Sequence, residues 1–572
     1  MKASDFIADF LAKKGIKSIF ELSGGMITHL LDSISQRTKI NIITMHHEQS
    51  AAFAADAYGR VTGLPGIALA TSGPGATNLL TGIGSCYFDS SPGIFITGQV
   101  NRSEQKGERG IRQLGFQETD IVAMATPITK ACFLVNDPTM LPTILEEAFR
   151  IATEGRPGPV LIDIPMDVQR AQIEEIKWIN TNVAIPVIEE AKYNDLIVSI
   201  KNAKRPLILA GRGIKAANTQ TLFDQFVEQT KIPVITTLLG LDAIGCDEPL
   251  RVGFIGSYGN RWANIAFGEC DLLIVLGSRL DIRQTGADTK FIENRKIYHI
   301  DCEAAEINNR IKGCESFLMD LNTFFNQFNE VAQDVIFTEY NEWLQHTTDL
   351  KLQWPDVKEL TPNGINPNVF MHTLSSVSSR ASAYLADVGS HQMWAAQSLQ
   401  VNKGQLFLTS GGMGAMGFCL PAGIGASIAL NKSPVVVIVG DGCMQLNIQE
   451  LQTVVRNKLP VKIIVMNNRT LGMIRQFQDS YFESRYQSTY WGYDAPDFEK
   501  VAVAYGIKAK TISEPEEIEE ATKWLWNSEN DGLPVVLQVM IDPHTNTYPK
   551  IAFGKPITEM EPFAKPIEME ST

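Results

Sequence analysis

The feature that most constrains this chain is a pair of apolar segments near its C-terminus, each followed by polar residues that could bind a cation. Residues 434–439 read Pro-Val-Val-Val-Ile-Val and run into Gly440-Asp441-Gly442. Residues 461–466 read Val-Lys-Ile-Ile-Val-Met and run into Asn467-Asn468. The stretch between them, 446–458, has a helical pattern. The three segments therefore predict one strand–helix–strand unit with parallel strands.

In such a unit Asp441 and Asn468 lie at the carboxyl ends of two parallel strands, the edge at which open α/β sheets bind ligands. Carboxylate and amide oxygens suit Mg²⁺, and the glycines beside Asp441 let a phosphate approach the backbone closely. A tight strand-to-helix turn is the alternative interpretation of Gly-Asp-Gly by itself. The spacing between two buried strands favours a phosphate-bearing cofactor bound through Mg²⁺.

The rest of the chain repeats this alternation of strand and helix patterns. Strand candidates fall at 42–44, 66–71, 93–97, 159–164, 206–210, 233–236, 272–276 and 296–300. We therefore expect an α/β protein with three doubly wound parallel-sheet domains. The predicted domains are 1–170, 190–330 and 366–545, with a polar stretch around Pro186, a helical connector at 331–365 and a tail at 546–572.

Composition argues against several classes of protein. Lys and Arg number 50 against 64 Asp and Glu, a net charge of −14 without a basic block, so we expect no nucleic-acid partner. The eight cysteines are scattered and form no CxxC pair, which predicts reduced thiols and a cytoplasmic location. Asp5 and Asp9 interrupt any signal-peptide core, and the glycines and Pro421 of 411–430 favour a buried helix over a membrane span.

The 440–468 motif resembles the thiamine diphosphate motif of the acetolactate synthase family, and the similarity covers nearly the whole chain, to about residue 545. The resemblance implies the thiamine diphosphate-binding fold, with Mg²⁺ bound by Asp441, Asn468 and the carbonyl oxygen of Thr470. Met416 matches the bulky residue that keeps the cofactor bent. The other expected cofactor contacts are Val388, Gly389, Ser390, His391, Gly440, Gly442, Cys443, Leu471 and Gly472.

Glu48 begins a helical stretch of small residues, where by itself it would complement the helix dipole. In the family the matching glutamate hydrogen-bonds N1′ of the aminopyrimidine, which promotes proton loss from thiazolium C2. The resemblance places the Ser72–Asn78 turn beside that ring and makes the Gly25 turn an oxyanion donor. The remaining expected catalytic residues are Phe116, Gln117, Lys130, Arg283, Met473 and Phe477.

The middle domain of the family binds FAD, which does no net redox work there. The matching residues in this chain are Gly211, Arg212, Gly213, Thr237, Leu238, Gly277, Arg279, Asp281, Asp301 and Asp320. The family also builds each thiamine site between two chains. The resemblance therefore implies a homodimer or homotetramer, and a small regulatory subunit is a further expected partner.

The chain departs from the family around the second-substrate pocket. Phe477 replaces a tryptophan, Ile282 an aspartate and Ser390 a glutamine, and Ser257-Tyr258 replaces a Met-His pair. The stretch 101–115 is longer than in the family and contains Lys106, Arg109 and Arg112, which could bind a larger anionic acceptor or lie in a plain surface loop.

The predicted activity is decarboxylation of pyruvate and transfer of its two-carbon unit to a second carbonyl, which gives 2-acetolactate when pyruvate is the acceptor. Arg283 would pair with the acceptor carboxylate. Alternatives are acetyl transfer to a nucleotide-linked keto-sugar, decarboxylation of a 2-keto acid or hydrolysis of a diketone, and a non-catalytic homologue. The presence of Glu48, Asp441 and Asn468 argues against the last of these.

Overall fold

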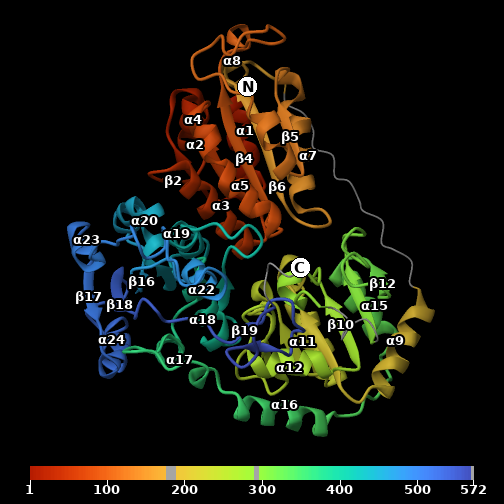
Figure 1. The fold of residues 1–572 in the computed structure, drawn as a ribbon. Helices are drawn as coiled ribbons and strands as arrows, with labels where there is room; N and C mark the ends of the chain where they lie inside the picture. Colours follow the sequence, from red (N-terminus) through yellow and green to blue (C-terminus); the bar gives the residue numbers. More distant parts are fainter. Residues whose placement is uncertain (175–188, 289–294, 568–572) are drawn as a thin grey trace.

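Three parallel sheets, each covered by helices on both faces, make up the protein (Figure 1). The computed structural model describes residues 1–174, 189–288 and 295–567. Within these ranges each of the three sheets has six strands, and all of their strand pairs are parallel. The prediction of an α/β protein with three doubly wound sheets is therefore confirmed. The polar stretch around Pro186 lies outside the described residues.

The first sheet has the strand order β2-β1-β3-β4-β6-β5. Its strands are β1 (Ser18–Leu22), β2 (Asn41–Thr44), β3 (Gly66–Ala70), β4 (Gly93–Gln99), β5 (Ala131–Leu134) and β6 (Pro159–Pro165). Its helices are α1 (Ala3–Lys13), α2 (Thr28–Arg37), α3 (Glu48–Thr62), α4 (Pro74–Asn78), α5 (Leu80–Phe88), α6 (Ile121–Ala125), α7 (Leu141–Thr153) and α8 (Met166–Arg170). The strand order reverses between β1 and β3, which makes their carboxyl ends the expected ligand edge.

The second sheet has the order β12-β11-β10-β7-β8-β9, which is the order of dinucleotide-binding sheets. Its strands are β7 (Pro206–Ala210), β8 (Val234–Thr236), β9 (Arg251–Phe254), β10 (Leu272–Leu276), β11 (Lys296–Asp301) and β12 (Glu315–Leu318). Its helices are α9 (Glu190–Asn202), α10 (Gly213–Ala216), α11 (Gln220–Thr230), α12 (Arg261–Glu269), α13 (Ile282–Thr285) and α15 (Leu321–Val331). Here the order reverses between β7 and β10.

The third sheet has the order β14-β13-β15-β16-β18-β17, which repeats the topology of the first. Its strands are β13 (Ala383–Ala386), β14 (Leu406–Leu408), β15 (Val435–Gly440), β16 (Val461–Asn467), β17 (Lys508–Ile512) and β18 (Val535–Met540). Its helices are α17 (Pro367–Val377), α18 (Ser390–Ser398), α19 (Cys419–Ala429), α20 (Asp441–Leu446), α21 (Leu451–Arg456), α22 (Gly472–Tyr481), α23 (Phe498–Ala504) and α24 (Ile518–Trp524). The expected ligand edge lies between β13 and β15.

Most of the segments predicted from sequence are confirmed, with two differences. The predicted helix 446–458 is broken at Asn447 into α20, a 3-10 turn at Ile448–Glu450 and α21. The Asn447 side chain donates a 2.7 Å hydrogen bond to the carbonyl oxygen of Gly417, which anchors it outside a helix. In 411–430 only α19 is helical, and the glycine-rich first half is irregular.

The connector and the tail both run along the second sheet. The connector contains α16 (Asn341–Gln353), which packs on α12 (Figure 1). The tail forms a short antiparallel hairpin of β19 (Lys550–Ile551) and β20 (Met560–Glu561). The backbone N–H of Ile551 donates a 2.8 Å hydrogen bond to the carbonyl oxygen of Ser257, just beyond β9. Within the described ranges, no helix has the length and apolarity needed to cross a membrane.

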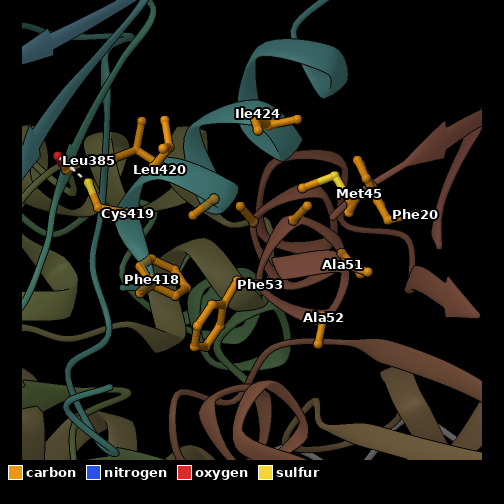
Figure 2. Packing of buried hydrophobic residues seen from close by; sticks show 14 of the residues in the cluster. Phe20, Met45, Ala51, Ala52, Phe53, Leu385, Phe418, Cys419, Leu420 and Ile424 are labelled. Carbon is orange, nitrogen blue, oxygen red and sulfur yellow. Dashed lines mark hydrogen bonds between the residues drawn. The ribbon is translucent and has the colours of Figure 1, made fainter. Parts of the chain in front are cut away.

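The first and third sheets are joined by close packing of α3 against α19 (Figure 2). The rings of Phe53 and Phe418 meet edge to face with centroids 5.3 Å apart. A Cβ added to Gly425 would lie 2.0 Å from the carbonyl oxygen of Ala54, so the two backbones approach too closely for any side chain there. The small residues that the sequence places in both helices are therefore required by this contact.

Candidate functional site

The carboxyl edge of the third sheet brings the turns after β13 and β15 together around a buried histidine. The backbone N–H of Gly440 donates a 3.1 Å hydrogen bond to Nε2 of His391. Burial lowers the pKa of His391 to about 3, so the ring is neutral and accepts at this nitrogen. A Cβ on Gly389 or on Gly440 would lie within 2.8 Å of the His391 ring, which explains why both positions are glycine.

Asp441, Asn468 and Ser390 lie beside this histidine, and the sheet register explains why. Gly440 pairs with Met466 across β15 and β16, so the residues that follow leave the same edge. A Cβ on Gly472 would lie 2.7 Å from Nδ2 of Asn468 and 2.9 Å from Oγ of Ser390. The structure thus brings together predicted diphosphate and metal residues from three different turns.

The donor set of this cluster fits Mg²⁺ and a diphosphate. Asp441 is 3% exposed, and burial raises its pKa to about 7, as expected for a carboxylate without a cationic partner. Oγ of Ser390 is buried and has no hydrogen-bond partner among the described residues. The described residues contain no group of three His, Cys, Asp or Glu side chains placed to bind a metal. A cation here would therefore use Asp441, the Asn468 amide and backbone oxygen, which suits Mg²⁺.

The apolar wall of this cluster comes from Met416 and Leu471. A Cβ on Gly442 would lie 3.3 Å from Cε of Met416 and 2.9 Å from Cδ2 of Leu471. Behind it, Sγ of Cys443 donates a 3.1 Å hydrogen bond to the carbonyl oxygen of Val388. The thiol of Cys443 therefore links the turn after β15 to the turn after β13.

Glu48 occupies the corresponding edge of the first sheet, as the first residue of α3. Its side chain is 7% exposed, and Nδ2 of Asn78 donates a 2.9 Å hydrogen bond to its Oε2. A Cβ on Gly75 would lie 3.1 Å from Oε1, so the glycine-rich turn lies directly against the carboxylate. Gly25 follows β1 at the same edge, and space is open around its Cα.

Phe116 and Gln117 lie in the loop after β4, close to the same glycine-rich turn. Gln117 has a φ of 65°, and a Cβ on Gly73 would lie 3.0 Å from its Cβ. The Phe116 side chain is 80% exposed. Gln117 is thus brought to the glycine-rich turn, whereas Phe116 is left exposed on this chain.

Lys130 is separated from this group. It immediately precedes β5, and strands in this sheet are parallel, so it lies at the amino edge, opposite to Glu48. Its Nζ donates a 2.6 Å hydrogen bond to the carbonyl oxygen of Glu154, and burial lowers its pKa. The structure therefore places Lys130 near the second sheet, on the side of Cys302 and Glu303, rather than beside Gln117.

A pocket opens where the three sheets meet, above the carboxyl edge of the second sheet. Its lining includes every middle-domain residue predicted from sequence except Gly211: Arg212, Gly213, Thr237, Leu238, Gly277, Arg279, Asp281, Asp301 and Asp320. A Cβ on Gly211 would lie 2.2 Å from the carbonyl oxygen of Gly277, so the two turns touch at the reversal point between β7 and β10. In sheets of this strand order, the crevice at the reversal point is where dinucleotides commonly bind.

Arg212 is the pocket residue that we single out as a candidate for binding a ligand. Its Nε is buried without a hydrogen-bond partner among the described residues, and burial lowers its pKa to about 10. Two of the acidic residues already have local roles. Asp281 accepts hydrogen bonds from the backbone N–H groups of Arg283 and Gln284, and Asp320 caps α15.

Arg283 lines the same pocket, and its neighbours come from several segments. Its carbonyl oxygen accepts a 2.6 Å hydrogen bond from the backbone N–H of Ser257. Its charge acts on the buried phenol of Tyr258, whose pKa burial raises to about 12. Tyr258 therefore stays neutral and offers a hydroxyl rather than a second charge beside the guanidinium.

Met473 and Phe477 lie one turn apart on α22. The Phe477 ring is 37% exposed and lies 4.7 Å from the ring of Tyr481, centroid to centroid. Tyr481 in turn meets Phe553 of the tail edge to face. The aromatic residue that stands in place of the family tryptophan is thus part of a stack that extends to the C-terminal hairpin.

The charged stretch 101–115 is an exposed loop organised by one carboxylate. Glu118 accepts backbone hydrogen bonds from Lys106, at 2.5 Å, and from Leu114, at 2.8 Å. The Arg109 guanidinium donates to the carbonyl oxygens of Gln105 and Lys106. Arg109 is therefore engaged within the loop.

Sequence reasoning missed two residues that organise these sites, Asp387 and Tyr493, and the role of a third, Asn78, which orients Glu48. Asn78 ends the glycine-rich turn that the sequence did indicate. Asp387 follows the apolar run 383–386, a strand signal that could have been found, and accepts hydrogen bonds from the backbone N–H groups of Gly417 and Cys419. Tyr493 hydrogen-bonds Asp441 from an irregular loop, for which the sequence carries no signal.

Comparison with known proteins agrees with this geometry. Residues 1–124, 193–328 and 387–539 match the N-terminal TPP binding, central and C-terminal TPP binding domains of thiamine pyrophosphate enzymes. The chain is 37% identical to the acetolactate synthase large subunit of Pyropia yezoensis, covering 98% of this chain and 95% of that one. It is 36% identical to the acetolactate synthase isozyme 2 large subunit of Escherichia coli strain K12, covering 98% and 99%. It is 34% identical to the Lactococcus lactis large subunit, covering 97% and 95%.

Proposed function

Because the chain belongs to the thiamine pyrophosphate enzymes and, within them, to the family of acetolactate synthase large subunits, we propose the following reaction and site. The protein is a thiamine diphosphate-dependent carboligase that decarboxylates pyruvate and joins the two-carbon unit to a second carbonyl. With pyruvate as acceptor, two pyruvate ions and one proton give one 2-acetolactate ion and one CO₂. The observation that carries the proposal is the convergence of Asp441, Asn468 and Ser390 at the reversal point of the third sheet.

Bound thiamine diphosphate supplies the carbon nucleophile and the electron sink that decarboxylation requires. In the proposed site Asp441, Asn468 and the Thr470 carbonyl bind Mg²⁺, and the Ser390 hydroxyl donates to the diphosphate. The other proposed contacts there are Val388, Gly389, His391, Gly440, Gly442, Cys443, Leu471 and Gly472. Met416 would supply apolar support for the cofactor.

The proton transfers are assigned to the first sheet. Glu48 would hold or release a proton at the aminopyrimidine, and the Asn78 amide keeps the carboxylate turned toward the glycine-rich turn. The backbone N–H of Gly25 stabilises negative charge on the substrate oxygen. Arg283 pairs with the acceptor carboxylate, and Phe116, Gln117, Met473 and Phe477 are the further substrate-contacting residues of the proposal. Lys130 is not among them, because it lies at the opposite sheet edge from Glu48.

We include FAD in the pocket of the second sheet as a structural cofactor. The dinucleotide strand order, the touching glycine turns and the unpartnered Nε of Arg212 support this assignment. Carboligation transfers no net electrons, so the flavin needs no redox role. Yellow protein with a flavin absorption spectrum after purification is the expected observation.

The same proposal assigns 1–170 to the aminopyrimidine, 190–330 to FAD and 366–545 to Mg²⁺ and the diphosphate, with 546–572 as a tail. The exposed Phe116 beside Gln117 fits a site that is completed by a second copy of the chain, in a homodimer or homotetramer. The relatives are named large subunits, so a smaller regulatory subunit is part of the proposal.

The ratio of pyruvate consumed to CO₂ released tests the reaction. A carboligase consumes two pyruvate ions per CO₂ and yields acetolactate, whereas a decarboxylase consumes one and yields acetaldehyde. The relatives do not favour the decarboxylase, hydrolase or keto-sugar alternatives. A ratio of one, or CO₂ release that requires a nucleotide keto-sugar, would overturn the carboligase assignment.

A further inference from the structure

One side chain outside the predicted cofactor residues reaches the carboxylate at the centre of the third-sheet site. The hydroxyl of Tyr493 donates a 3.1 Å hydrogen bond to Oδ2 of Asp441. A Cβ on Gly442 would lie 3.2 Å from the same hydroxyl oxygen, so the phenol lies directly over the Gly-Asp-Gly turn. Tyr493 thus gives this carboxylate a side-chain hydrogen-bond donor.

The loop that carries Tyr493 is anchored to the other side of the same site. The Thr470 hydroxyl donates a 2.8 Å hydrogen bond to the carbonyl oxygen of Thr489, and the backbone N–H of Leu471 donates to that oxygen at 3.0 Å. Thr470 is the residue whose carbonyl oxygen is proposed as a Mg²⁺ ligand. The loop therefore joins two of the three proposed ligands, Asp441 directly and Thr470 through Thr489.

A phenol is well suited to this place for a reason of charge. Tyrosine is neutral at physiological pH, so it orients the carboxylate without offsetting the negative charge that attracts a divalent cation. A lysine or arginine would compete with the metal for Asp441. Groups that orient a ligating side chain in this way commonly change metal affinity 10- to 100-fold.

We propose that Tyr493 is a positioning residue for Mg²⁺: its hydroxyl fixes the rotation of the Asp441 carboxylate and so sets the affinity of the site for the cation. The inference rests on the proposed function, which supplies the metal. It makes Tyr493 a determinant of cofactor assembly and leaves the proton transfers at Glu48 untouched.

The test is a Mg²⁺ titration of metal-free protein in saturating thiamine diphosphate, for wild type and Tyr493→Phe. Binding is followed by calorimetry and, in parallel, by recovery of pyruvate consumption. We expect the Mg²⁺ concentration at half-saturation to rise about 10- to 100-fold in both measurements. At saturating Mg²⁺, kcat and the KM for pyruvate should equal those of wild type, which a general loss of structure would not allow.

Tyr490→Phe is the matched control, because it removes a phenol hydroxyl from the same loop. The Tyr490 side chain is 40% exposed and makes ring contacts with Tyr486 and His544. Its Mg²⁺ half-saturation should be that of wild type. Equal thermal midpoints of the metal-free proteins establish that Tyr493→Phe is folded; if its midpoint falls, Tyr493→Leu, which also lacks the hydroxyl, replaces it.

The proposal is overturned if a folded variant without the Tyr493 hydroxyl has wild-type Mg²⁺ affinity, or if only its kcat at saturating Mg²⁺ falls. Failure of the proposed function looks different, since wild type itself would then show no Mg²⁺-dependent uptake of thiamine diphosphate.

Discussion

The side-chain amide of Asn78 donates a 2.9 Å hydrogen bond to Oε2 of Glu48, joining the last residue of α4 to the first residue of α3. The bond turns the carboxylate toward the glycine-rich turn, where Gly75 leaves room for it. Since Glu48 is almost fully buried, this geometry is set by the protein before any cofactor arrives. The Glu48 carboxylate is therefore already oriented for the proposed proton exchange with the aminopyrimidine.

Glu48→Gln should lower kcat by about 10²- to 10⁴-fold, the usual contribution of a positioned acid–base group. Thiamine diphosphate should still bind, because the amide has nearly the shape of the carboxyl group. Pyruvate consumption and cofactor binding, measured side by side, separate the two effects. Glu146→Gln is the control, a partly exposed carboxylate paired with Lys14, and should leave kcat unchanged. Wild-type turnover in Glu48→Gln would rule out the proposed proton transfer.

Arg212→Leu should yield protein with less bound flavin, because it removes the buried guanidinium that would bind a phosphate-bearing ligand. The flavin spectrum of the purified protein, normalised to protein concentration, measures the loss. Arg205→Leu removes an exposed arginine just before β7 and should keep the full flavin content. The same flavin content in both variants would contradict the assignment of the pocket.

Asp163 should make stability fall as the pH rises toward 8. Burial raises the pKa of Asp163 to about 7, despite hydrogen bonds from Thr97 and Gln99. The folded state therefore retains a proton that the unfolded chain releases above its ordinary carboxyl pKa. This contribution is complete below about pH 4 and is lost as the pH rises through about 7, with a slope of at most about 1.4 kcal/mol per pH unit.

Asp163→Asn should remove that dependence, since the amide is neutral throughout and can exchange hydrogen bonds with the same two partners. Urea unfolding at about pH 5.5 and about pH 8 gives the comparison. We expect the drop in unfolding free energy between the two pH values to be smaller in the variant. An equal drop would show that Asp163 is already ionised at the lower pH.

Gly425→Ala should destabilise the protein by about 1–3 kcal/mol, the usual cost of overpacking a closely packed contact. Its Cβ would meet the Ala54 carbonyl oxygen at 2.0 Å, and backbone cannot move aside as a side chain can. Gly110→Ala, in the exposed 101–115 loop, adds the same methyl group where no atom lies within 4 Å. Thermal unfolding of both variants should show a lower midpoint for the first alone.

The sequence predicts an element of this structure when the residues that determine the element lie within it. The strands around 434–439 and 461–466 could be predicted because both faces of a central parallel strand are buried, which gives a continuous apolar run. The break at Asn447 could not, because its partner Gly417 lies 30 positions away. β5 was also missed, since this edge strand is short and only partly buried.

The residues of the candidate site also divide into those that a local pattern predicts and those that depend on distant parts of the chain. Asp441 and Asn468 stand at predictable strand ends, and the fold brings them together as expected. Tyr493 comes from an irregular loop whose path is set by Thr470 and Thr489, so no spacing rule leads to it. Lys130 is placed by resemblance, yet the parallel direction of β5 sets it at the opposite sheet edge from Glu48.

The contact between α3 and α19 also has a consequence in time. Ala54 leaves the ribosome about 370 residues before Gly425, which at roughly 5–20 residues per second amounts to about 20–75 s. For that interval the face of α3 that carries Phe53 lacks the helix that covers it in the finished molecule. During synthesis this apolar face is therefore a place where aggregation can begin, until α19 has been made and packs on it.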